Sequence, residues 1–390
     1  MLYVGIDVSK DDFSVCFLRP ESKRKKEKLP VFKYEQTRKG FKSFLSKLNS
    51  FGDKEPLAVM ESTGTYHENL RKFMDDEGIN VVVLNPASVK KHMDVLSKSK
   101  TDEIDARNLV KIACHFMETV ETSNIPQDKQ LALRELVRFR QNLVEECSGY
   151  KKRLRNYLRL TMPEVLNEFS SMGSVVLLHL LKEYPTKEKM LADPEGVVEL
   201  LRSHRWKEED ARDLLNNLKE SIGGKKDQYG SYERVILLCV KKISENEEEA
   251  EALKKEIEKL LKDYPDHPAG SIPGVGTISL AIIIAETGDI FRFISKKHFV
   301  SYTGLEPKLR ESGRWRGNTR ISKQGNAHLR HVFYRIASRV IGRSDKYKAI
   351  YNNLRERGKS HKKAVTAIAR KMAELAYVLT INNTTFSEEH

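Results

Sequence analysis

The order of strand-like and helix-like segments in residues 1–125 constrains the fold of this chain more than any other feature of its sequence. Three strand-like segments come first, and a polar Ser-Lys-Asp-Asp turn between the first two is typical of a hairpin. Helix-like and strand-like segments then alternate, with Thr101 as the expected N-cap of the last helix. The expected strands cover residues 2–8, 12–18, 29–34, 56–60 and 80–84, and the expected helices cover residues 39–48, 67–77 and 101–116. This order predicts a mixed α/β sheet of the RNase H type. A Rossmann sheet is the competing fold, but no GxGxxG motif follows the first strand.

The middle of the chain carries two long apolar stripes with heptad spacing. The first stripe, interrupted by Arg140, consists of Leu133, Leu136, Leu143, Cys147, Tyr150, Leu154 and Tyr157. The second consists of Ile236, Cys239, Ile243, Asn246, Ala250, Leu253, Ile257, Leu260 and Tyr264. Such stripes predict long helices paired as a coiled coil, either with each other or across subunits, and the polar Asn246 would fix their register.

The predicted organisation therefore has three parts. Residues 1–125 form a RuvC-like domain of the RNase H type, and residues 126–264 form the coiled-coil helices, with a small helical insert at about residues 163–224. Residues 265–390 form a mostly helical, basic C-terminal domain. In that domain, Ser271–Thr277 resembles a helix-hairpin-helix turn, in which the amides of Gly274 and Gly276 would hold a DNA phosphate. The alternative is a tight turn between helices that binds nothing.

Positive charge is concentrated near the C-terminus. The chain of 390 residues has a net charge of +14, yet residues 291–370 contain 21 Lys and Arg against four acids, a net +17. The other 310 residues therefore sum to −3. Because phosphate contacts dominate nucleic-acid affinity, this gradient favours a C-terminal surface that binds polyanions, although a merely solubilising basic face is the alternative.

Composition excludes several other classes of protein. No stretch of about 18 apolar residues is present, so no membrane helix is expected. The four cysteines lie far apart and form no CxxC pair, which argues against a zinc knuckle or a disulfide framework and fits a reducing cytoplasm. No HExxH motif or Ser-His-Asp arrangement is evident.

Four carboxylates occupy positions that could converge. Asp7 and Glu61 end the first and fourth expected strands, which are neighbours in an RNase H-type sheet, and Asp102 and Asp105 share one face at the start of a helix. Carboxylate oxygens suit Mg²⁺ or Mn²⁺, and two such ions can activate the attacking oxygen and stabilise the leaving oxygen of a phosphodiester. Taken singly, each acid has a plain structural role as a turn residue or a helix-dipole partner.

Seven sequence blocks in order give a family resemblance over nearly the whole chain, least in residues 163–224. They are GIDVSKDDFSV, MESTGTYHENL, LNPASVKKH, KSKTDEIDARNLVKIA, SIPGVGTISLAIIIAETGDI, SYTGLEPKLRESGRWRG and RISKQGNAHLRHVFY. The chain resembles the DEDD transposases of the insertion-sequence 110 family, which also contains the Piv-type DNA invertases. The resemblance implies that Asp7, Glu61, Asp102 and Asp105 bind the metal and that Ser312 is the nucleophile, forming a phosphoserine link to DNA.

The resemblance also implies the partners. Family members act as homo-oligomers, dimers or tetramers, in which the carboxylates and the serine of different subunits meet. A structured non-coding RNA of the element, a bridge RNA, pairs with donor and target DNA. We expect a cytoplasmic, nucleoid-associated prokaryotic protein. The residues expected to contact nucleic acid are Lys308, Arg310, Arg314, Arg316, Arg320, Lys323 and Arg330, together with Gly274 and Gly276.

Three alternatives remain open at this point. Tyr302 and Ser322 are rival nucleophiles near the same basic cluster. A RuvC-like, structure-specific nuclease such as a junction resolvase would use the carboxylates without a covalent intermediate. A non-enzymatic nucleic-acid-binding protein would use neither the carboxylates nor the serine for chemistry.

Overall fold

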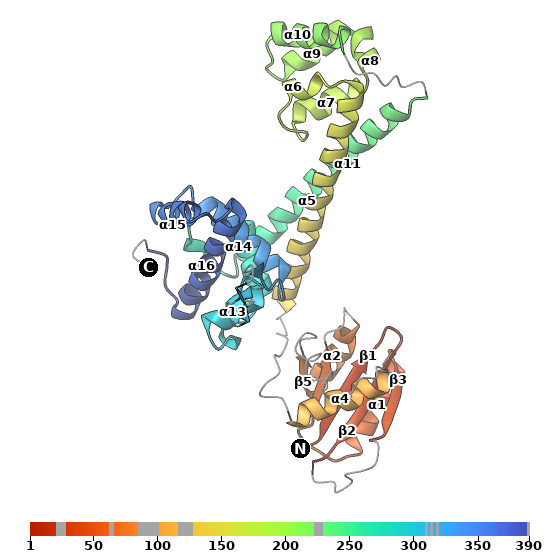
Figure 1. Cartoon of the computed structure of the whole chain (residues 1–390). Helices are drawn as coiled ribbons and strands as arrows, with labels where there is room; N and C mark the ends of the chain where they lie inside the picture. The colour runs from red at the N-terminus through yellow and green to blue at the C-terminus, as the bar shows by residue number, and fades with distance from the viewer. Residues whose placement is uncertain are drawn as a thin grey trace. The chain divides into compact units, whose positions relative to one another are not determined.

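The computed structural model divides the chain into two units, Met1–Ile125 and Pro126–His390 (Figure 1). The structure describes residues 1–20, 29–61, 66–84, 101–115, 128–221, 229–308, 311–312, 315–316 and 320–387. The finer division of the second unit at about residue 264 stays a prediction.

The first unit is built on a five-stranded mixed sheet in the order β3-β2-β1-β4-β5. The strands are β1 (Tyr3–Val8), β2 (Asp12–Leu18), β3 (Val31–Glu35), β4 (Leu57–Glu61) and β5 (Asn80–Leu84). The first three strands are antiparallel neighbours, and β4 and β5 run parallel to β1. The predicted mixed sheet is confirmed, and the first and fourth strands are neighbours as expected. This strand order is typical of an RNase H-type sheet.

Alternation of side chains along the strands gives the sheet two apolar faces. On one face, the core of Val4, Ile6, Phe13, Val15 and Met60 packs against helices α1 (Arg38–Asn49) and α2 (His67–Asp76). On the other face, helix α4 (Asp102–His115) packs on β1, β2 and β4. Its buried residues Ala106, Leu109, Val110, Ile112 and Ala113 cover Cys16, Val59 and Leu84. The helices therefore lie within a few residues of their predicted bounds.

Two long helices dominate the second unit. Helix α5 (Asp128–Thr161) and helix α11 (Ser231–Leu261) pack side by side along much of their length (Figure 1). Most of the second predicted stripe is buried, including Asn246 at 8% exposure. Arg140, which interrupts the first stripe, donates a hydrogen bond to the Ala250 carbonyl of α11 at 3.0 Å. The two stripes therefore meet within one chain; coiled-coil packing in the strict sense stays a prediction.

The expected helical insert lies between these two helices. It contains α6 (Val165–Glu168), α7 (Val175–Glu183), α8 (Lys187–Ala192), α9 (Pro194–Ser203) and α10 (Glu208–Lys219). Their apolar side chains form one core with the adjoining ends of α5 and α11, where Phe169 stacks on Trp206 with ring centroids 5.0 Å apart. The insert is thus a packed helical module.

The remaining helices pack around the other end of α5 and α11. They are η2 (Pro268–Ser271), α12 (Thr277–Thr287), η3 (Ile290–Arg292), α13 (Lys296–Thr303), α14 (Ala327–Val340), α15 (Asp345–Glu356) and α16 (His361–Asn382). Their core includes Val365, Ile368, Met372 and Leu379 of α16. No helix in the described part of the chain is both long and apolar enough to cross a membrane.

Candidate carboxylate edge and serine arm

Asp7 and Glu61 lie on neighbouring strands at one edge of the sheet. The parallel register of β1 and β4 places Ile6 opposite Met60, so Asp7 and Glu61 are the next residues on the two strands. Because Ile6 and Met60 point into the core beneath α1 and α2, alternation along the strands directs Asp7 and Glu61 to the face that α4 covers.

The first turn of α4 brings Asp102 and Asp105 to this same face. Thr101 caps the helix, as predicted: its side-chain oxygen accepts a hydrogen bond from the Ile104 amide at 3.3 Å. Asp102 is exposed and Asp105 is half-buried. Asp102 also acts electrostatically on Lys33 of β3, so the start of α4 lies toward the sheet edge where β1 and β4 end.

Gly5 explains how α4 comes so close to the sheet. A Cβ atom at this position would lie 2.3 Å from the amide nitrogen of Val110 and 2.4 Å from the carbonyl oxygen of Ala106. Only a residue without a Cβ admits the helix backbone at this distance. Sequence reasoning missed Gly5, although a glycine inside an apolar strand is a signal of close backbone approach.

The same face carries a cation that sequence reasoning also missed. Lys33 forms an ion pair with Asp12 of β2 at 2.8 Å. The hydrogen bond and charge of Asp12, and then the charge of Asp102, raise the pKa of Lys33. Lys33 is opposite Ser14 in the register of β2 and β3, and Ser14 is opposite Asp7 in that of β1 and β2. Lys33 thus lies on the same face of the sheet as Asp7, two strands away, and within electrostatic reach of Asp102.

The carboxylates have the donor chemistry of a magnesium or manganese site. Within the residues that the structure describes, no three acidic, histidine or cysteine side chains come close enough together to hold a metal ion. Asp7, Glu61, Asp102 and Asp105 therefore share a face and the right chemistry, without forming a closed set of ligands.

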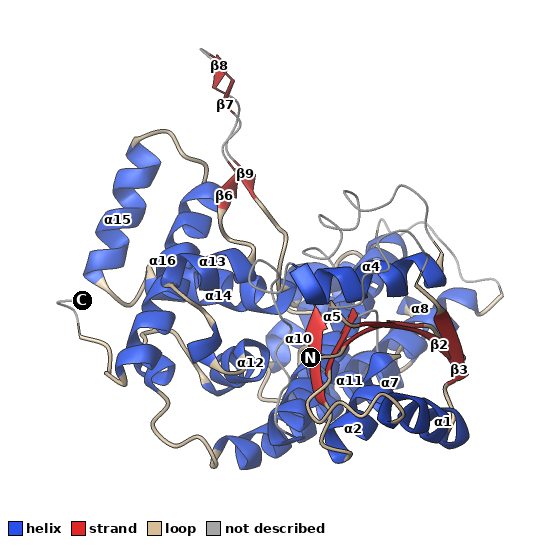
Figure 2. Cartoon of the chain, turned by 90° about the horizontal axis from the view of Figure 1, so that it is seen from below, coloured by secondary structure: helices blue, strands red, loops and turns tan. Residues whose placement is uncertain are grey.

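Ser312 lies on an extended two-stranded arm of the second unit (Figure 2). At the arm's base, β6 (Pro307–Lys308) pairs with β9 (Arg320–Ile321). Further out, β7 (Glu311–Ser312) pairs with β8 (Trp315–Arg316), and Ser312 is opposite Trp315. Arg310 and Arg314 lie outside the described residues. Lys308 and Arg320 pair with each other in the β6–β9 ladder, and Arg316 lies in the same β7–β8 ladder as Ser312.

Backbone contacts hold the base of the arm. The amide of Ser322 donates to the Glu306 carbonyl at 2.8 Å, and that of Asn326 donates to the Tyr302 carbonyl at 2.7 Å. Arg330 reaches back from α14 and donates to the carbonyls of Thr303 and Lys323 at 3.4 and 3.3 Å. The two chain segments that enter and leave the arm are therefore fastened to each other.

A buried carboxylate lies under this base. Glu286 is 1% exposed and accepts two hydrogen bonds from Arg138, at 2.7 and 2.9 Å, and one from the Asn326 side chain at 2.6 Å. Burial alone would raise the pKa of Glu286, but the bonds from Arg138 and Asn326 outweigh it and lower the pKa. Asn326 in turn caps α14 through the Leu329 amide.

Of the rival nucleophiles, Tyr302 is engaged in packing. Its hydroxyl donates to the Glu286 carbonyl at 3.2 Å, and its ring lies against Phe293 and beneath Arg292. Ser322 donates weakly to the Gln324 carbonyl at 3.5 Å. The choice among Ser312, Tyr302 and Ser322 as the nucleophile stays a prediction.

The glycine turn before α12 has a structural use. Gly274 has a φ of +92°, and a Cβ there would lie 3.1 Å from Cβ of Arg339 on α14. Gly276 is the N-cap of α12, and a single 3-10 turn, η2, precedes the segment. Close packing on α14 accounts for Gly274, while phosphate binding by Gly274 and Gly276 stays a prediction.

Comparison with known proteins places the chain in a family. A model of DEDD transposases of the IS110 type matches residues 4–163, and a model of IS116/IS110/IS902 family transposases matches residues 267–352. The chain therefore belongs to the IS110 family of transposases, as its sequence blocks predict.

Similar proteins extend along nearly the whole chain. An insertion element IS110 protein of Streptomyces coelicolor is 23% identical over 98% of this chain and 95% of its own length. The transposase of insertion sequence IS1111A from Coxiella burnetii is 24% identical over 98% and 90%, respectively. A pilin gene-inverting protein of Moraxella bovis is 21% identical over 99% and 98%. The Thermus thermophilus RuvC structure, at 13% identity and a TM-score of 0.25, covers 32% of this chain and all of that one; this similarity is too low to bear on the fold.

Proposed function

We propose that this chain cleaves and rejoins DNA to move an insertion sequence. The observation that carries the proposal is the adjacency of Asp7 and Glu61 on the sheet face that α4 covers, with Asp102 and Asp105 in the first turn of that helix. These four carboxylates would hold Mg²⁺ or Mn²⁺. When bound there, the ions would activate the attacking oxygen and stabilise the leaving oxygen.

Ser312 is the proposed nucleophile. Its Oγ bonds to phosphorus as a bond from phosphorus to a sugar oxygen breaks; the serine loses its proton, and the released sugar hydroxyl gains one. A sugar hydroxyl of the new DNA partner then displaces the serine and restores the phosphodiester. Each step exchanges one phosphorus–oxygen bond for another, so rejoining needs no external energy source. Lys308, Arg310, Arg314, Arg316 and Arg320 would hold the scissile phosphate near the serine.

Two further partners complete the proposal. A structured non-coding RNA of the element would select donor and target DNA by base pairing, a mode of recognition that leaves sequence reading to the RNA. Other copies of the chain, in a dimer or tetramer, would bring the serine of one subunit to the carboxylates of another. Residues 126–264 would then be the scaffold, and residues 265–390 the domain that carries the nucleophile.

The competing function is a RuvC-like nuclease that hydrolyses DNA and leaves Ser312 without a chemical role. A covalent intermediate separates the two. The full chain is incubated with RNA transcribed from the element's non-coding region, labelled DNA carrying the element ends, and Mg²⁺, and the products are resolved under denaturing conditions. We expect a protein–DNA adduct that is absent from Ser312→Ala. Cleavage without an adduct supports the nuclease, and an adduct that persists in Ser312→Ala moves the nucleophile to Tyr302 or Ser322.

The carboxylates are tested in the same reaction. Asp7→Ala, Glu61→Ala and Asp102→Ala should each abolish both adduct and recombination while RNA binding is kept, because these acids contribute metal affinity rather than core packing. Asp105→Ala should be milder, since water can replace one ligand of four. Recombination near the wild-type level in any of the first three variants would refute the metal site.

A further inference from the structure

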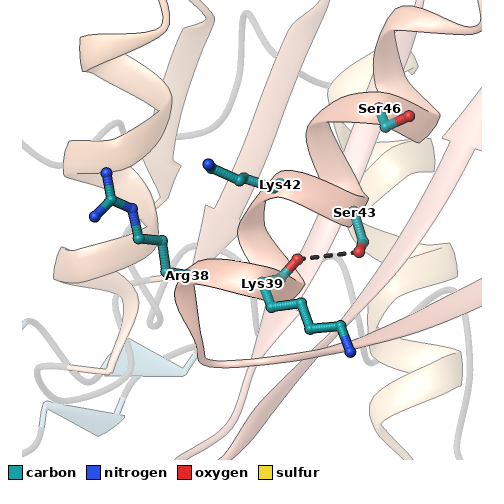
Figure 3. Close-up of a pocket in the computed structure, with 5 residues that line it drawn as sticks. All are labelled: Arg38, Lys39, Lys42, Ser43 and Ser46. Atoms are coloured by element: carbon teal, nitrogen blue, oxygen red, sulfur yellow. Dashed lines mark hydrogen bonds between the residues drawn. The ribbon is translucent and has the colours of Figure 1, made fainter.

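The outer face of α1 carries a basic surface that the proposed chemistry does not use. Arg38, Lys39 and Lys42, with Ser43 and Ser46, line a shallow, open depression of about 630 Å³ (Figure 3). All five residues are exposed, and the first turn of α1 contains no acidic residue. We call these five residues the α1 surface.

The α1 surface results directly from the amphipathic pattern of the helix. Phe44 and Leu48 are buried in the core beneath the sheet, which turns the basic residues toward solvent. Arg38 and Lys42 are four residues apart, one turn of helix with a rise of about 6 Å, and so lie on the same side. Figure 3 shows both side chains extending away from the helix on that side. Two cations in a row fit the evenly spaced charges of a phosphodiester backbone.

The start of α1 lies at the same sheet edge as the carboxylates, while α1 itself covers the face opposite to the one toward which Asp7 and Glu61 point. Strand β3 ends at Glu35, opposite Asp12 at the beginning of β2, and α1 begins three residues later. Between them, the Gln36 side chain donates to the carbonyl of Ser9, in the turn that follows β1, at 3.2 Å and to that of Tyr66, before α2, at 2.9 Å. This contact fastens the start of α1 to the turn that comes directly after Asp7 and Val8.

We propose that the α1 surface binds the phosphate backbone of the duplex DNA whose scissile phosphate occupies the carboxylate edge. The inference rests on the proposed function, because it assumes that DNA enters that edge. The four carboxylates repel a polyanion until metal is bound, and a cationic surface beginning at the same edge offsets this repulsion. Contacts from Arg38 and Lys42 go to phosphate, so they position the duplex without reading its sequence.

Binding measurements test the inference independently of catalysis. Arg38→Gln/Lys42→Gln is compared with a control of equal charge, Lys54→Gln/Lys72→Gln, whose side chains are also exposed on the same unit. Affinity of the full chain for a fluorescent DNA duplex is measured by anisotropy between 50 and 200 mM salt, conditions in which each phosphate contact contributes about 0.9 to the log–log slope. We expect the first variant to reduce the magnitude of this negative slope by about 1.8, and the control variant to leave the slope unchanged.

Three outcomes would overturn the inference: an unchanged slope, an equal loss in both variants, or a loss for an RNA duplex with none for DNA. Thermal unfolding of both variants shows whether the fold is retained. As a second readout, Ser46→Cys carrying an azidophenacyl crosslinker should react with the DNA duplex, whereas Lys72→Cys on α2 should not. If the inference fails but the adduct of Ser312 forms, the proposed function stands; if the adduct fails but the α1 slope changes, only DNA binding is established.

Discussion

Arg138 of α5 and Glu286 of α12 form a bidentate ion pair beneath the base of the serine arm, with Nε to Oε1 at 2.7 Å and Nη2 to Oε2 at 2.9 Å. Glu286 is almost fully buried, whereas Arg138 remains 40% exposed at its side chain. The side-chain amide of Asn326 donates a third hydrogen bond to the Glu286 carboxylate, and Asn326 also caps α14. The Glu286 carboxylate, at the end of α12, therefore links helix α5 to Asn326, the residue that connects the arm to helix α14.

Removal of the Arg138 guanidinium should lower the free energy of unfolding. In Arg138→Met, the carboxylate of Glu286 would stay buried with only Asn326 to bind it. Leaving a buried charged acceptor poorly paired costs about 1–3 kcal/mol, and partial exposure of the arginine site keeps the loss in that range. The matched control is Arg159→Met, an exposed arginine of the same helix, which should change stability by less than about 0.5 kcal/mol. Urea unfolding of the two variants measures the difference; equal losses would contradict a special role for the pair.

The same carboxylate predicts a dependence of stability on pH. Its pKa in the folded chain is lowered from 4.5, since the bonds from Arg138 and Asn326 outweigh burial. A lowered folded pKa gives stability that is present above the unfolded pKa and lost as the pH falls through the folded pKa. The gap in unfolding free energy between wild type and Glu286→Gln should thus be full at pH 7 and narrow below about pH 4.5. If the difference in unfolding free energy between wild type and Glu286→Gln stays constant from pH 7 to pH 3, ionisation of Glu286 is not its cause.

Gly5 offers a test of how α4 is placed. In Gly5→Ala, the added methyl carbon would meet backbone atoms of Val110 and Ala106 and force α4 away from β1. Overpacking of this kind costs about 1–3 kcal/mol. It should also reduce recombination, because the displaced helix carries Asp102 and Asp105. The control is Gly149→Ala in α5, where a Cβ meets nothing within 4 Å and alanine favours the helix. A Gly5→Ala variant with unchanged stability would refute the close contact.

The architecture of the first unit could be predicted from sequence because local patterns determine it. Period-two apolar segments and a polar turn define β1 and β2, and helical spacing defines α1 and α2. Their order then restricts the sheet to few topologies. The adjacency of Asp7 and Glu61 follows from that topology alone, since residues at matching ends of neighbouring parallel strands must lie side by side.

Contacts between distant segments could not be predicted in this way. Nothing local distinguishes Glu286 in Ala-Glu-Thr-Gly-Asp from a surface acid, because its partners Arg138 and Asn326 are 148 and 40 residues away. Lys33 likewise looks like any exposed lysine until the register places it near Asp12 and Asp102. For Ser312, the role came from family resemblance, since a serine before glycine is by itself a typical turn residue.

The serine arm, with the rest of the basic segment 291–370, should supply much of the salt-dependent affinity for nucleic acid. Replacing Arg314, Arg316, Arg320 and Lys323 with glutamine removes four cations from a segment of net charge +17. If each contacts a phosphate, the slope of log affinity against log salt should fall by about 3–4. The control replaces four exposed lysines of α11 and its C-cap with glutamine, namely Lys241, Lys255, Lys259 and Lys262. Equal slopes in wild type and the arm variant would mean that the basic face only promotes solubility.

The last prediction concerns the assembly that brings serine and carboxylates together. Ser312 belongs to the second unit and Asp7 to the first, so the two groups come from different compact units of the chain. If they meet across subunits, a mixture of Ser312→Ala and Asp7→Ala chains should recover adduct formation, because a mixed assembly contains sites with an intact serine from one subunit and intact carboxylates from the other. In a randomly mixed dimer, half of the molecules are heterodimers, and one of the two sites in each is intact. About a quarter of the wild-type yield is therefore expected, an estimate that treats sites as independent and non-interacting.

Mixing Ser312→Ala with the double variant Asp7→Ala/Ser312→Ala is the control and should give no adduct. If the first mixture is as inactive as the control while both chains still co-assemble, serine and carboxylates act within one chain.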